Sequence, residues 1–194
     1  MAVRLPAARR RRQLLDVALE RFAANGFHRT SMEEIADAAG VTKPVLYQHF
    51  GSKRELYLEL LDDVGRRLME LIAGAVAGAA GPRAQVEAGF AAYFQFVADH
   101  QSAFNLLFGS GARRDEEFAD AVRKVENTIA ESIAPLIEAE IDADHRRILA
   151  HGLVGLAEGT SRHWVANGLD LDPTKVARRI AELAWGGLRS VHRD

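Results

Sequence analysis

The chain has 194 residues, of which 48% are hydrophobic, so it is long enough and apolar enough to bury a core. It contains no cysteine, which excludes a disulfide framework, a thiol nucleophile and cysteine-ligated zinc. The formal net charge is −2, but the first 60 residues hold 10 Lys/Arg against 7 Asp/Glu, while the remainder holds 15 against 20. Such a basic N-terminal part is expected where only that part meets phosphate, although a chance asymmetry explains it equally well.

Helix is the regular structure that the sequence indicates. Proline is scarce, with 5 residues, and the helix-favouring Ala, Leu, Arg and Glu are abundant. No alternating run of Val, Ile and Thr predicts a strand. The longest apolar stretch, Ile72 to Ala80, is about half of what spans a bilayer, and no long apolar segment follows Arg9–Arg12. We predict an all-α protein of about nine helices, in the cytoplasm, without a signal peptide or membrane contact.

The first predicted helix follows a flexible basic tail, residues 1–8. It runs from about Ala8 to Ala24, and its apolar face repeats at positions i, i+3, i+4 and i+7, with Leu15, Ala18, Leu19 and Phe22. Asn25-Gly26 ends it, because both residues tolerate the left-handed conformation of a helix C-cap.

A short second helix is predicted up to Gly40. A capping box opens it, formed either by Thr30 with Glu33 or by Ser31 with Glu34. Its length is only about two turns, which leaves a tight, glycine-containing turn behind it.

A third helix begins with Thr42 as N-cap. Pro44 is tolerated because it falls in the first turn, and Leu46 and Phe50 face inward before Gly51 ends the helix. The residues left for solvent are polar, aromatic or small, and none is acidic: Thr42, Lys43, Pro44, Val45, Tyr47, Gln48 and His49. Two short helices around a tight turn, the second with an acid-free face, predict a helix-turn-helix that enters a DNA groove. The alternative is a plain helical hairpin.

A long fourth helix is predicted to open with a capping box of Ser52 and Glu55. Its end is expected at the glycines from Gly74 to Gly81-Pro82. Helices are then predicted near 83–99, 101–109, 114–139, 142–167 and 173–191.

Residues 9–60 resemble the N-terminal domain of TetR-family regulators. The resemblance is carried, without an internal gap, by Thr30–Ala36, Ala39–Lys43 and Leu46–Phe50, followed by Ser52-Lys53. It implies a DNA-binding domain over 9–55 and an effector-binding and dimerisation domain over 56–194. It also implies a homodimer on a palindromic operator of double-stranded DNA, acting first of all as a ligand-responsive repressor.

The resemblance assigns DNA contacts by position. Base contacts concentrate at Thr42, Lys43, Pro44 and Val45, with Tyr47, Gln48 and His49 beside them. Lys53 matches a lysine that clamps a phosphate. Thr30 and Ser31 would offer a hydroxyl or an amide to phosphate, or only cap the helix. Arg9–Arg12 either reach the minor groove or form a solvated tail.

The last two predicted helices are apolar over more than one face, which indicates burial against a second subunit or ordinary packing within the chain. The family resemblance implies a four-helix dimer interface. The candidate interface residues are Leu153, Leu156, Trp164, Ile180, Leu183, Ala184, Trp185 and Leu188.

Aromatic residues gather in the predicted helices between the DNA-binding part and the last two helices. They are either core residues or the lining of an effector cavity. The candidate effector contacts are Phe90, Tyr93, Phe94, Phe104, Phe108 and Phe118, with Phe96 nearby. Segments such as Phe104–Phe108, Arg162–Trp164 and Ala184–Leu188 resemble actinobacterial fatty-acid-biosynthesis regulators of the same family. Those respond to long-chain acyl-CoA and can activate transcription, so the resemblance implies an apolar effector and leaves the sign of regulation open.

Two other classes compete. A metal-dependent enzyme would draw on His145, His151, His163, Asp142, Asp144 and Glu158, but no HExxH or paired Glu-x-x-His pattern is present. Phosphate-binding loops and nucleophile elbows are also missing from the sequence. We therefore expect no enzyme, cofactor or metal. A helical lipid-binding protein without DNA binding is disfavoured by the acid-free third helix.

Overall fold

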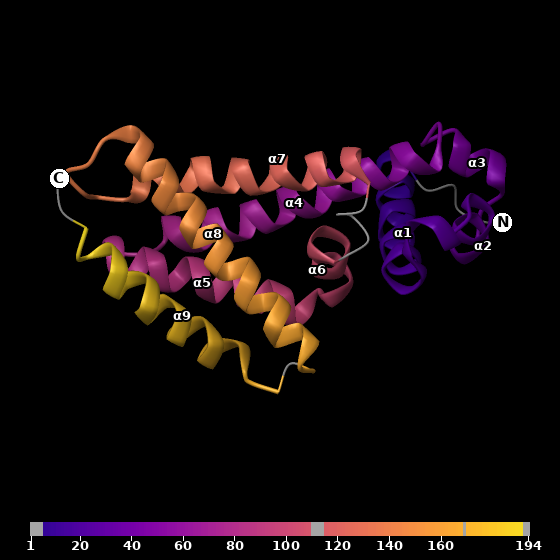
Figure 1. Cartoon of the computed structure of the whole chain (residues 1–194). Helices are drawn as coiled ribbons and strands as arrows, with labels where there is room; N and C mark the ends of the chain where they lie inside the picture. Colours follow the sequence, from indigo (N-terminus) through magenta and orange to yellow (C-terminus); the bar gives the residue numbers. More distant parts are fainter. Residues whose placement is uncertain (1–5, 110–114, 169, 192–194) are drawn as a thin grey trace. The chain divides into compact units, whose positions relative to one another are not determined.

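The computed structural model describes residues 6–109, 115–168 and 170–191, and every regular element among them is a helix (Figure 1). This confirms the predicted all-α class. The elements are α1 (Ala7–Arg29), α2 (Met32–Ala38), α3 (Lys43–Tyr47), α4 (Lys53–Ala77), α5 (Pro82–Asp99), α6 (Gln101–Phe108), α7 (Glu116–Ile133), the 3-10 turn η2 (Ala134–Leu136), α8 (Ala143–Ala166) and α9 (Pro173–Leu188).

The capping box at the start of α2 is the one between Ser31 and Glu34. Glu34 N donates to Ser31 Oγ at 3.1 Å, and Ser31 N donates to the Glu34 carboxylate at 2.6 Å. Hydrogen bonds from the Ser31 backbone amide and the Ser31 side chain to its carboxylate hold the pKa of Glu34 below its usual range. The predicted interruption of the first helix at Asn25-Gly26 is also confirmed, since Gly26 has the non-helical angles φ 77° and ψ 165° inside α1. One further helical turn follows Gly26, which the sequence did not predict.

The end of the fourth helix is confirmed: α4 passes Gly74 and ends at Ala77, before Gly78, within the predicted range. Two other predicted boundaries differ from the structure. The helix α3 ends at Tyr47, before Phe50, although Phe50 is buried as expected. The segment predicted as one helix over 114–139 gives way to η2 at Pro135, whose ring removes an N–H and crowds the preceding turn.

The described residues group into two compact units. The first takes in the chain up to Val64 together with Ser102–Ala121, and the second takes in Gly65–Gln101 and the chain from Val122. The boundaries of these compact units differ from the predicted division into a DNA-binding and an effector-binding domain after residue 55. That functional division stays a prediction.

The first unit is built around apolar side chains of α1 to α4. Its fully buried members include Leu14, Ile35, Leu46, Phe50 and Leu56, all of which fall on predicted inward faces or next to them. Burial of these side chains fixes α2 and α3 against α1 and α4, and so sets the direction in which α3 presents its other face.

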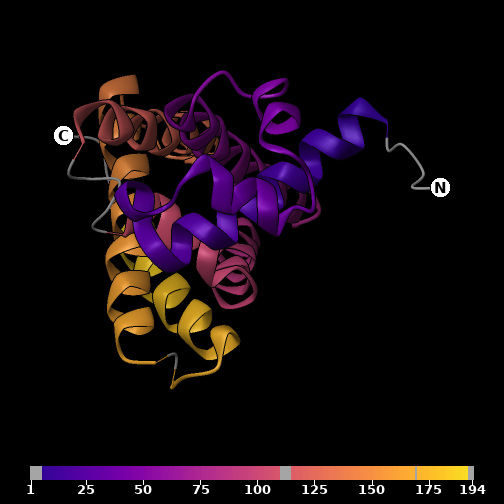
Figure 2. The same ribbon diagram turned by 90° about the vertical axis from the view of Figure 1, so that its right-hand side faces the viewer.

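In the second unit, α9 packs along α5, and α8 lies next to both (Figures 1 and 2). Phe94 and Trp164 lie in the core of this unit, with 5.8 Å between their ring centroids. In the part of the chain that the structure describes, no helix is both long and apolar enough to cross a bilayer.

Candidate DNA-binding surface

The face of α3 that is turned to solvent carries the residues predicted to read DNA. Thr42, Lys43, Pro44 and Gln48 are exposed, Tyr47 is 43% exposed, and Val45 and His49 are half-buried. No residue from Thr42 to His49 is acidic. Thr42 is the N-cap of α3, but its hydroxyl makes no capping hydrogen bond. The hydroxyl is therefore available to an outside acceptor such as a phosphate or a base edge.

The turn between α2 and α3 is held from several sides. Gly40 has φ 64°, in the left-handed region that favours glycine. Val41 N donates to Ala36 O at 3.0 Å, and Gln13 of α1 donates through Nε2 to Ala39 O at 3.2 Å. These bonds fix the angle between α2 and α3. A fixed angle is needed if α3 is to fit into a DNA groove.

The Thr30 hydroxyl is turned into the protein, which leaves an amide contact or a capping role among the predicted alternatives. The residue is only 1% exposed, and its hydroxyl oxygen lies 2.9 Å from Gly26 O and 3.2 Å from Arg21 O. Thr30 therefore closes the end of α1. Ser31, in contrast, is exposed, and its Oγ accepts the Glu34 amide in the capping box of α2, so its phosphate contact stays a prediction.

Lys53 is engaged within the protein. Its ammonium donates to Phe27 O at 2.9 Å and to Thr30 O at 3.0 Å, and it lies 4.4 Å from the centroid of the Phe27 ring. Both carbonyls belong to the link between α1 and α2. Two of the three donors of the ammonium thus hold the link between α1 and α2 to α4, and the phosphate contact of Lys53 stays a prediction.

The basic run near the N-terminus divides into two kinds of residue. Arg11 forms an ion pair with Glu59 and lies 4.4 Å from the Phe50 ring centroid. Arg12 pairs with Asp63 of α4, whose side chain is almost fully buried, at 2.9 Å. These two arginines link α1 to α4 and are therefore not a freely solvated tail. Arg9 is exposed.

Phe118, predicted to line an effector cavity, belongs instead to the first unit. Its ring packs on Tyr57 at 4.4 Å and on Phe27 at 4.8 Å between centroids. The guanidinium of Arg54 lies 4.7 Å from the same ring, donates to Asp115 at 2.7 Å and pairs with Glu117. These neighbours and its burial indicate a core residue of the first unit, and its role toward an effector stays a prediction.

The other predicted effector residues are all buried. Phe104 and Phe108 lie in the first unit, with 5.3 Å between ring centroids. Phe90, Tyr93 and Phe94 lie in the second unit and form one ring cluster. Their role toward an effector stays a prediction.

The sequence analysis missed a buried polar pair in the second unit. Ser161 Oγ lies 3.1 Å from Tyr93 Oη and 2.6 Å from Ala157 O, and both side chains are buried. Burial raises the pKa of Tyr93 well above its usual range. Only the i, i+4 spacing of Ser161 from Ala157 was visible in the sequence, which does not distinguish this residue from a surface serine.

Two residues predicted at a dimer interface are buried within the protomer. Trp164 packs on Phe94 and donates through Nε1 to Leu171 O at 3.0 Å. Ala184 is also buried, on a side of α9 that faces the same core. Both are corrected to intrachain core residues, because an apolar helix face seen in sequence does not say which chain covers it.

The outward sides of α8 and α9 carry exposed apolar and small residues among charged ones. Leu183 is 62% exposed and Ile148, which the sequence analysis missed, is 69% exposed. The exposed glycines Gly152, Gly155 and Gly159 follow Ile148 along α8. The remaining interface candidates are half-buried: Leu153, Leu156, Ile180, Trp185 and Leu188.

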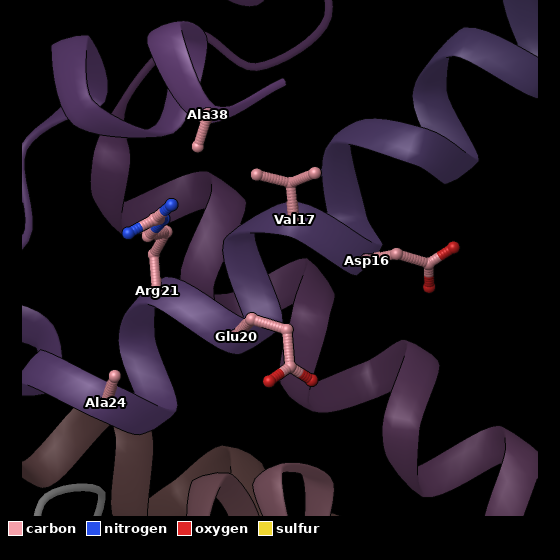
Figure 3. A pocket seen from close by; sticks show the side chains of 6 residues that line it. All are labelled: Asp16, Val17, Glu20, Arg21, Ala24 and Ala38. Atoms are coloured by element: carbon pink, nitrogen blue, oxygen red, sulfur yellow. The ribbon is translucent and has the colours of Figure 1, made fainter. Parts of the chain in front are cut away.

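An open depression of about 520 Å³ lies between α1 and α2 in the first unit (Figure 3). Ala38 faces Val17 and Arg21 across it, as Figure 3 shows. Two carboxylates at its edge, Asp16 and Glu20, bond to Arg12 and to the Ser102 hydroxyl. Carboxylates repel phosphate, so this side of α1 differs chemically from the face of α3.

The residues that suggested a metal site have structural partners. Asp142 caps α8 by accepting from His145 N at 2.7 Å, Asp144 pairs with Arg147, and Glu158 pairs with Arg162. Over the described ranges, no group of three or more His, Asp or Glu side chains is placed to hold a metal ion.

Two family models match the sequence over these same regions. The model of bacterial regulatory proteins of the tetR family matches residues 14–60, from α1 into α4. The model of the tetracyclin repressor-like C-terminal domain matches residues 82–187, from α5 into α9.

Individual proteins are similar over nearly the whole chain. The HTH-type transcriptional activator FasR of Mycolicibacterium smegmatis is 34% identical over 190 residues, which are 97% of this chain and 87% of that protein. A TetR-like transcriptional regulator from Rhodococcus sp. RHA1 has a TM-score of 0.79 at 32% identity, covering 97% of this chain and 100% of that one. FadR of Bacillus subtilis, solved in complex with stearoyl-CoA, has a TM-score of 0.72 at 19% identity over 93% of this chain and 99% of that one, a likeness of fold alone.

Proposed function

The chain belongs to the TetR family of bacterial regulatory proteins, and from this premise we propose that it binds a palindromic operator as a dimer and responds to an apolar effector. As a member of this family it is a DNA-binding transcription regulator and not an enzyme. The observation that carries the proposal is the acid-free outer face of α3, on which Tyr47 is 43% exposed.

The proposed readout uses the two ends of α3 differently. Thr42, Lys43, Pro44 and Val45 form its first turn, where side chains reach base edges when the helix lies in the major groove. Tyr47, Gln48 and His49 follow at its end and meet phosphate or the outer bases. Ser31 donates to a phosphate at the start of α2.

Lys53 is proposed to bind the same phosphate as Ser31. An ammonium has three donors, and two of them are directed to Phe27 O and Thr30 O. We infer that the third donor reaches the phosphate that Ser31 also binds. A lysine fixed by two carbonyls loses little further freedom on binding, which favours the contact.

Dimerisation is proposed through the outward faces of α8 and α9. Ile148 and Leu183 are large apolar side chains in water, and Gly152, Gly155 and Gly159 would let a second helix approach closely. A C2 dimer of this kind presents two α3 helices, so it calls for half-sites about one helical turn apart or somewhat more.

The effector is proposed to be apolar, with a long acyl chain as the leading class. The support is the resemblance of the C-terminal segments to acyl-CoA-responsive regulators, together with the buried rings of Phe90, Tyr93 and Phe94 in the second unit. FadR of Bacillus subtilis, which shares the fold, was solved with stearoyl-CoA.

The sign of regulation follows from where the operator lies relative to the promoter. FasR is named an activator, so this protein's relatives are not confined to repression. A reporter gene behind the selected operator, read with and without the regulator, assigns activation or repression directly.

Selection of bound fragments from random duplex DNA tests the DNA-binding proposal. We expect a palindromic consensus, and a gel shift with it that the Tyr47→Ala variant weakens. If the selection enriches no sequence, or a site without internal symmetry, this result would contradict the binding of a palindromic operator by a dimer. Addition of oleoyl-CoA to the complex then tests the effector proposal, with a change in operator affinity as the expected result.

A further inference from the structure

The first two residues of α4 each place a cation on an aromatic ring. Lys53 Nζ lies 4.4 Å from the centroid of the Phe27 ring, and Arg54 Cζ lies 4.7 Å from the centroid of the Phe118 ring. The two rings contact each other edge to face, with 4.8 Å between their centroids. All of these residues belong to the first unit, and they form one row of contacts in the order Arg54, Phe118, Phe27, Lys53.

The start of α7 holds the Phe118 end of this row in place. Asp115 Oδ1 accepts hydrogen bonds from the backbone amides of Glu117 at 3.2 Å and of Phe118 at 3.4 Å. The same oxygen accepts from Arg54 Nη2 at 2.7 Å, and the Arg54 guanidinium also pairs with Glu117. The hydrogen bond from Arg54 holds the pKa of Asp115 below its usual range, so the carboxylate stays charged at neutral pH. The Phe118 ring is buried between these groups and has little freedom to move.

The position of the Lys53 ammonium depends on the Phe27 ring at the other end of the row. Phe27 follows Gly26, where α1 departs from helical geometry, and it is only half-buried. The ammonium lies on this ring and donates to the Phe27 carbonyl oxygen at 2.9 Å, while the Phe118 ring packs against another side of the Phe27 ring. Loss of the Phe118 ring would leave space into which the Phe27 ring can turn, and the ammonium would lose the ring face beneath it.

We propose that Phe118 and Arg54 are positioning residues for the phosphate contact of Lys53, and that they act through the Phe27 ring. This role rests on the proposed function, in which the third donor of Lys53 reaches a phosphate. It extends DNA binding to α7, since Phe118 lies within residues 82–187, the region that the C-terminal family model matches. Residues outside the predicted DNA-binding domain therefore set the geometry of a DNA contact.

Titration of the selected operator with the full-length protein at several salt concentrations tests this role. Phe118→Leu changes no charge, yet we expect it to weaken operator binding about 3- to 30-fold and to lower the salt dependence by about one counterion per protomer, as Lys53→Ala does. A variant that is merely less stable contains less folded protein, but its folded fraction releases as many counterions as the parent. Val122→Ala, at a buried residue one turn further along α7, is the matched control and should leave the salt dependence unchanged.

A double-mutant cycle tests whether Phe118 acts through Lys53. In the Lys53→Ala protein, Phe118→Leu should have no further effect on operator affinity, whereas independent effects would add. Thermal melting shows whether each variant folds. If Phe118→Leu does not, Arg54→Gln provides a second cycle, because the Arg54 side chain is 43% exposed and its loss should leave the protein folded. A direct contact of Arg54 with DNA would add to the effect of Lys53→Ala, while a positioning role would not.

The outcomes separate the positioning role from the proposed function. If Lys53→Ala lowers the salt dependence but Phe118→Leu and Arg54→Gln do not, the positioning role is overturned and the phosphate contact of Lys53 stands. Effects that add to that of Lys53→Ala overturn the positioning role in the same way. If Lys53→Ala itself leaves the salt dependence unchanged, the proposed phosphate contact fails, and the positioning role fails with it.

Discussion

Lys53 contacts Phe27 twice: its ammonium donates to the Phe27 carbonyl oxygen at 2.9 Å and lies 4.4 Å from the centroid of the Phe27 ring. A third contact, to Thr30 O at 3.0 Å, joins the start of α4 to the C-cap residue of α1. One side chain therefore holds the helix-turn-helix in place and supplies a positive charge beside it. Loss of this side chain should change both stability and DNA affinity.

We expect Lys53→Ala to lower the free energy of unfolding by about 1–3 kcal/mol, because two partly buried carbonyls lose their donor. It should also weaken operator binding. Lys43→Ala is the matched control, since Lys43 is exposed on α3. That change should leave stability within about 0.5 kcal/mol and lower the salt dependence of binding by about one counterion. Urea unfolding and DNA titration at several salt concentrations measure both. A Lys53→Ala protein as stable as the parent would refute the structural role.

Tyr47 should matter for DNA and not for folding. Its side chain is 43% exposed, so Tyr47→Ala removes little buried surface and should change the unfolding free energy by less than about 0.5 kcal/mol. Loss of a base or phosphate contact should weaken operator binding by about 1–3 kcal/mol. Tyr47→Phe separates the hydroxyl from the ring. Unchanged gel-shift affinity in both variants would remove Tyr47 from the DNA-binding surface.

The pair of Arg12 and Asp63 should contribute to stability and not to DNA affinity. Asp63 is buried and Arg12 donates to it at 2.9 and 3.0 Å, so Arg12→Gln leaves a buried carboxylate with one cation fewer. We expect a loss of about 1–3 kcal/mol in unfolding free energy. Arg9→Gln, at an exposed arginine of the same run, is the control and should cost little stability. Equal denaturant midpoints for the two variants would contradict the assignment.

Tyr57 should make the protein sensitive to strong alkali. Burial, with the added negative charge of Asp115, raises the pKa of Tyr57 to about 12. The unfolded chain then releases this proton first, at a pKa near 10, so stability is full below about pH 10 and falls as pH rises toward 12. Tyr57→Phe should flatten that decline by at most about 2–3 kcal/mol. Unfolding curves from pH 9 to 12 measure it; identical slopes for parent and variant would show that Tyr57 ionises freely when folded.

Charges placed on the outer faces of α8 and α9 should separate the dimer. Ile148 and Leu183 are 69% and 62% exposed, so Ile148→Glu and Leu183→Glu should leave the protomer folded. In a dimer each adds two like charges to one symmetric interface, and we expect a dissociation constant at least about 100-fold higher. Leu136→Glu, at an exposed leucine of η2, is the control. Sedimentation at micromolar protein concentration measures the mass of the particle in solution. If both variants remain dimeric, the dimer interface lies elsewhere.

Local chemistry made much of the first unit predictable. Ser31 and Glu34 cap α2, and Gly40 takes the left-handed turn, because both effects depend on residues a few positions apart. The acid-free face of α3 is likewise visible from spacing alone, once Leu46 and Phe50 are assigned to the core.

Tertiary structure decided the residues whose partners are distant along the chain. The sequence predicts a phosphate contact or a cap at Thr30, and the structure turns its hydroxyl to the Gly26 carbonyl of α1. The sequence places Phe118 among effector candidates, and the structure packs its ring on Phe27 and Tyr57. The predicted interface residue Trp164 is core. A helical period shows which face is apolar, but only the packing of separate helices shows what covers that face.

The sequence by itself thus determined the helical class, the turn of the helix-turn-helix and the chemical character of α3, since all of these follow from short-range propensity and periodicity. It narrowed the capping box of α2 to two residue pairs, of which the structure shows Ser31 with Glu34. Only the tertiary structure shows that the charged groups of Lys53, Arg11 and Arg12 bind carbonyls and carboxylates of the protein itself. A long cationic side chain can reach either solvent or a neighbouring helix, and the position of that neighbour is a property of the assembled core.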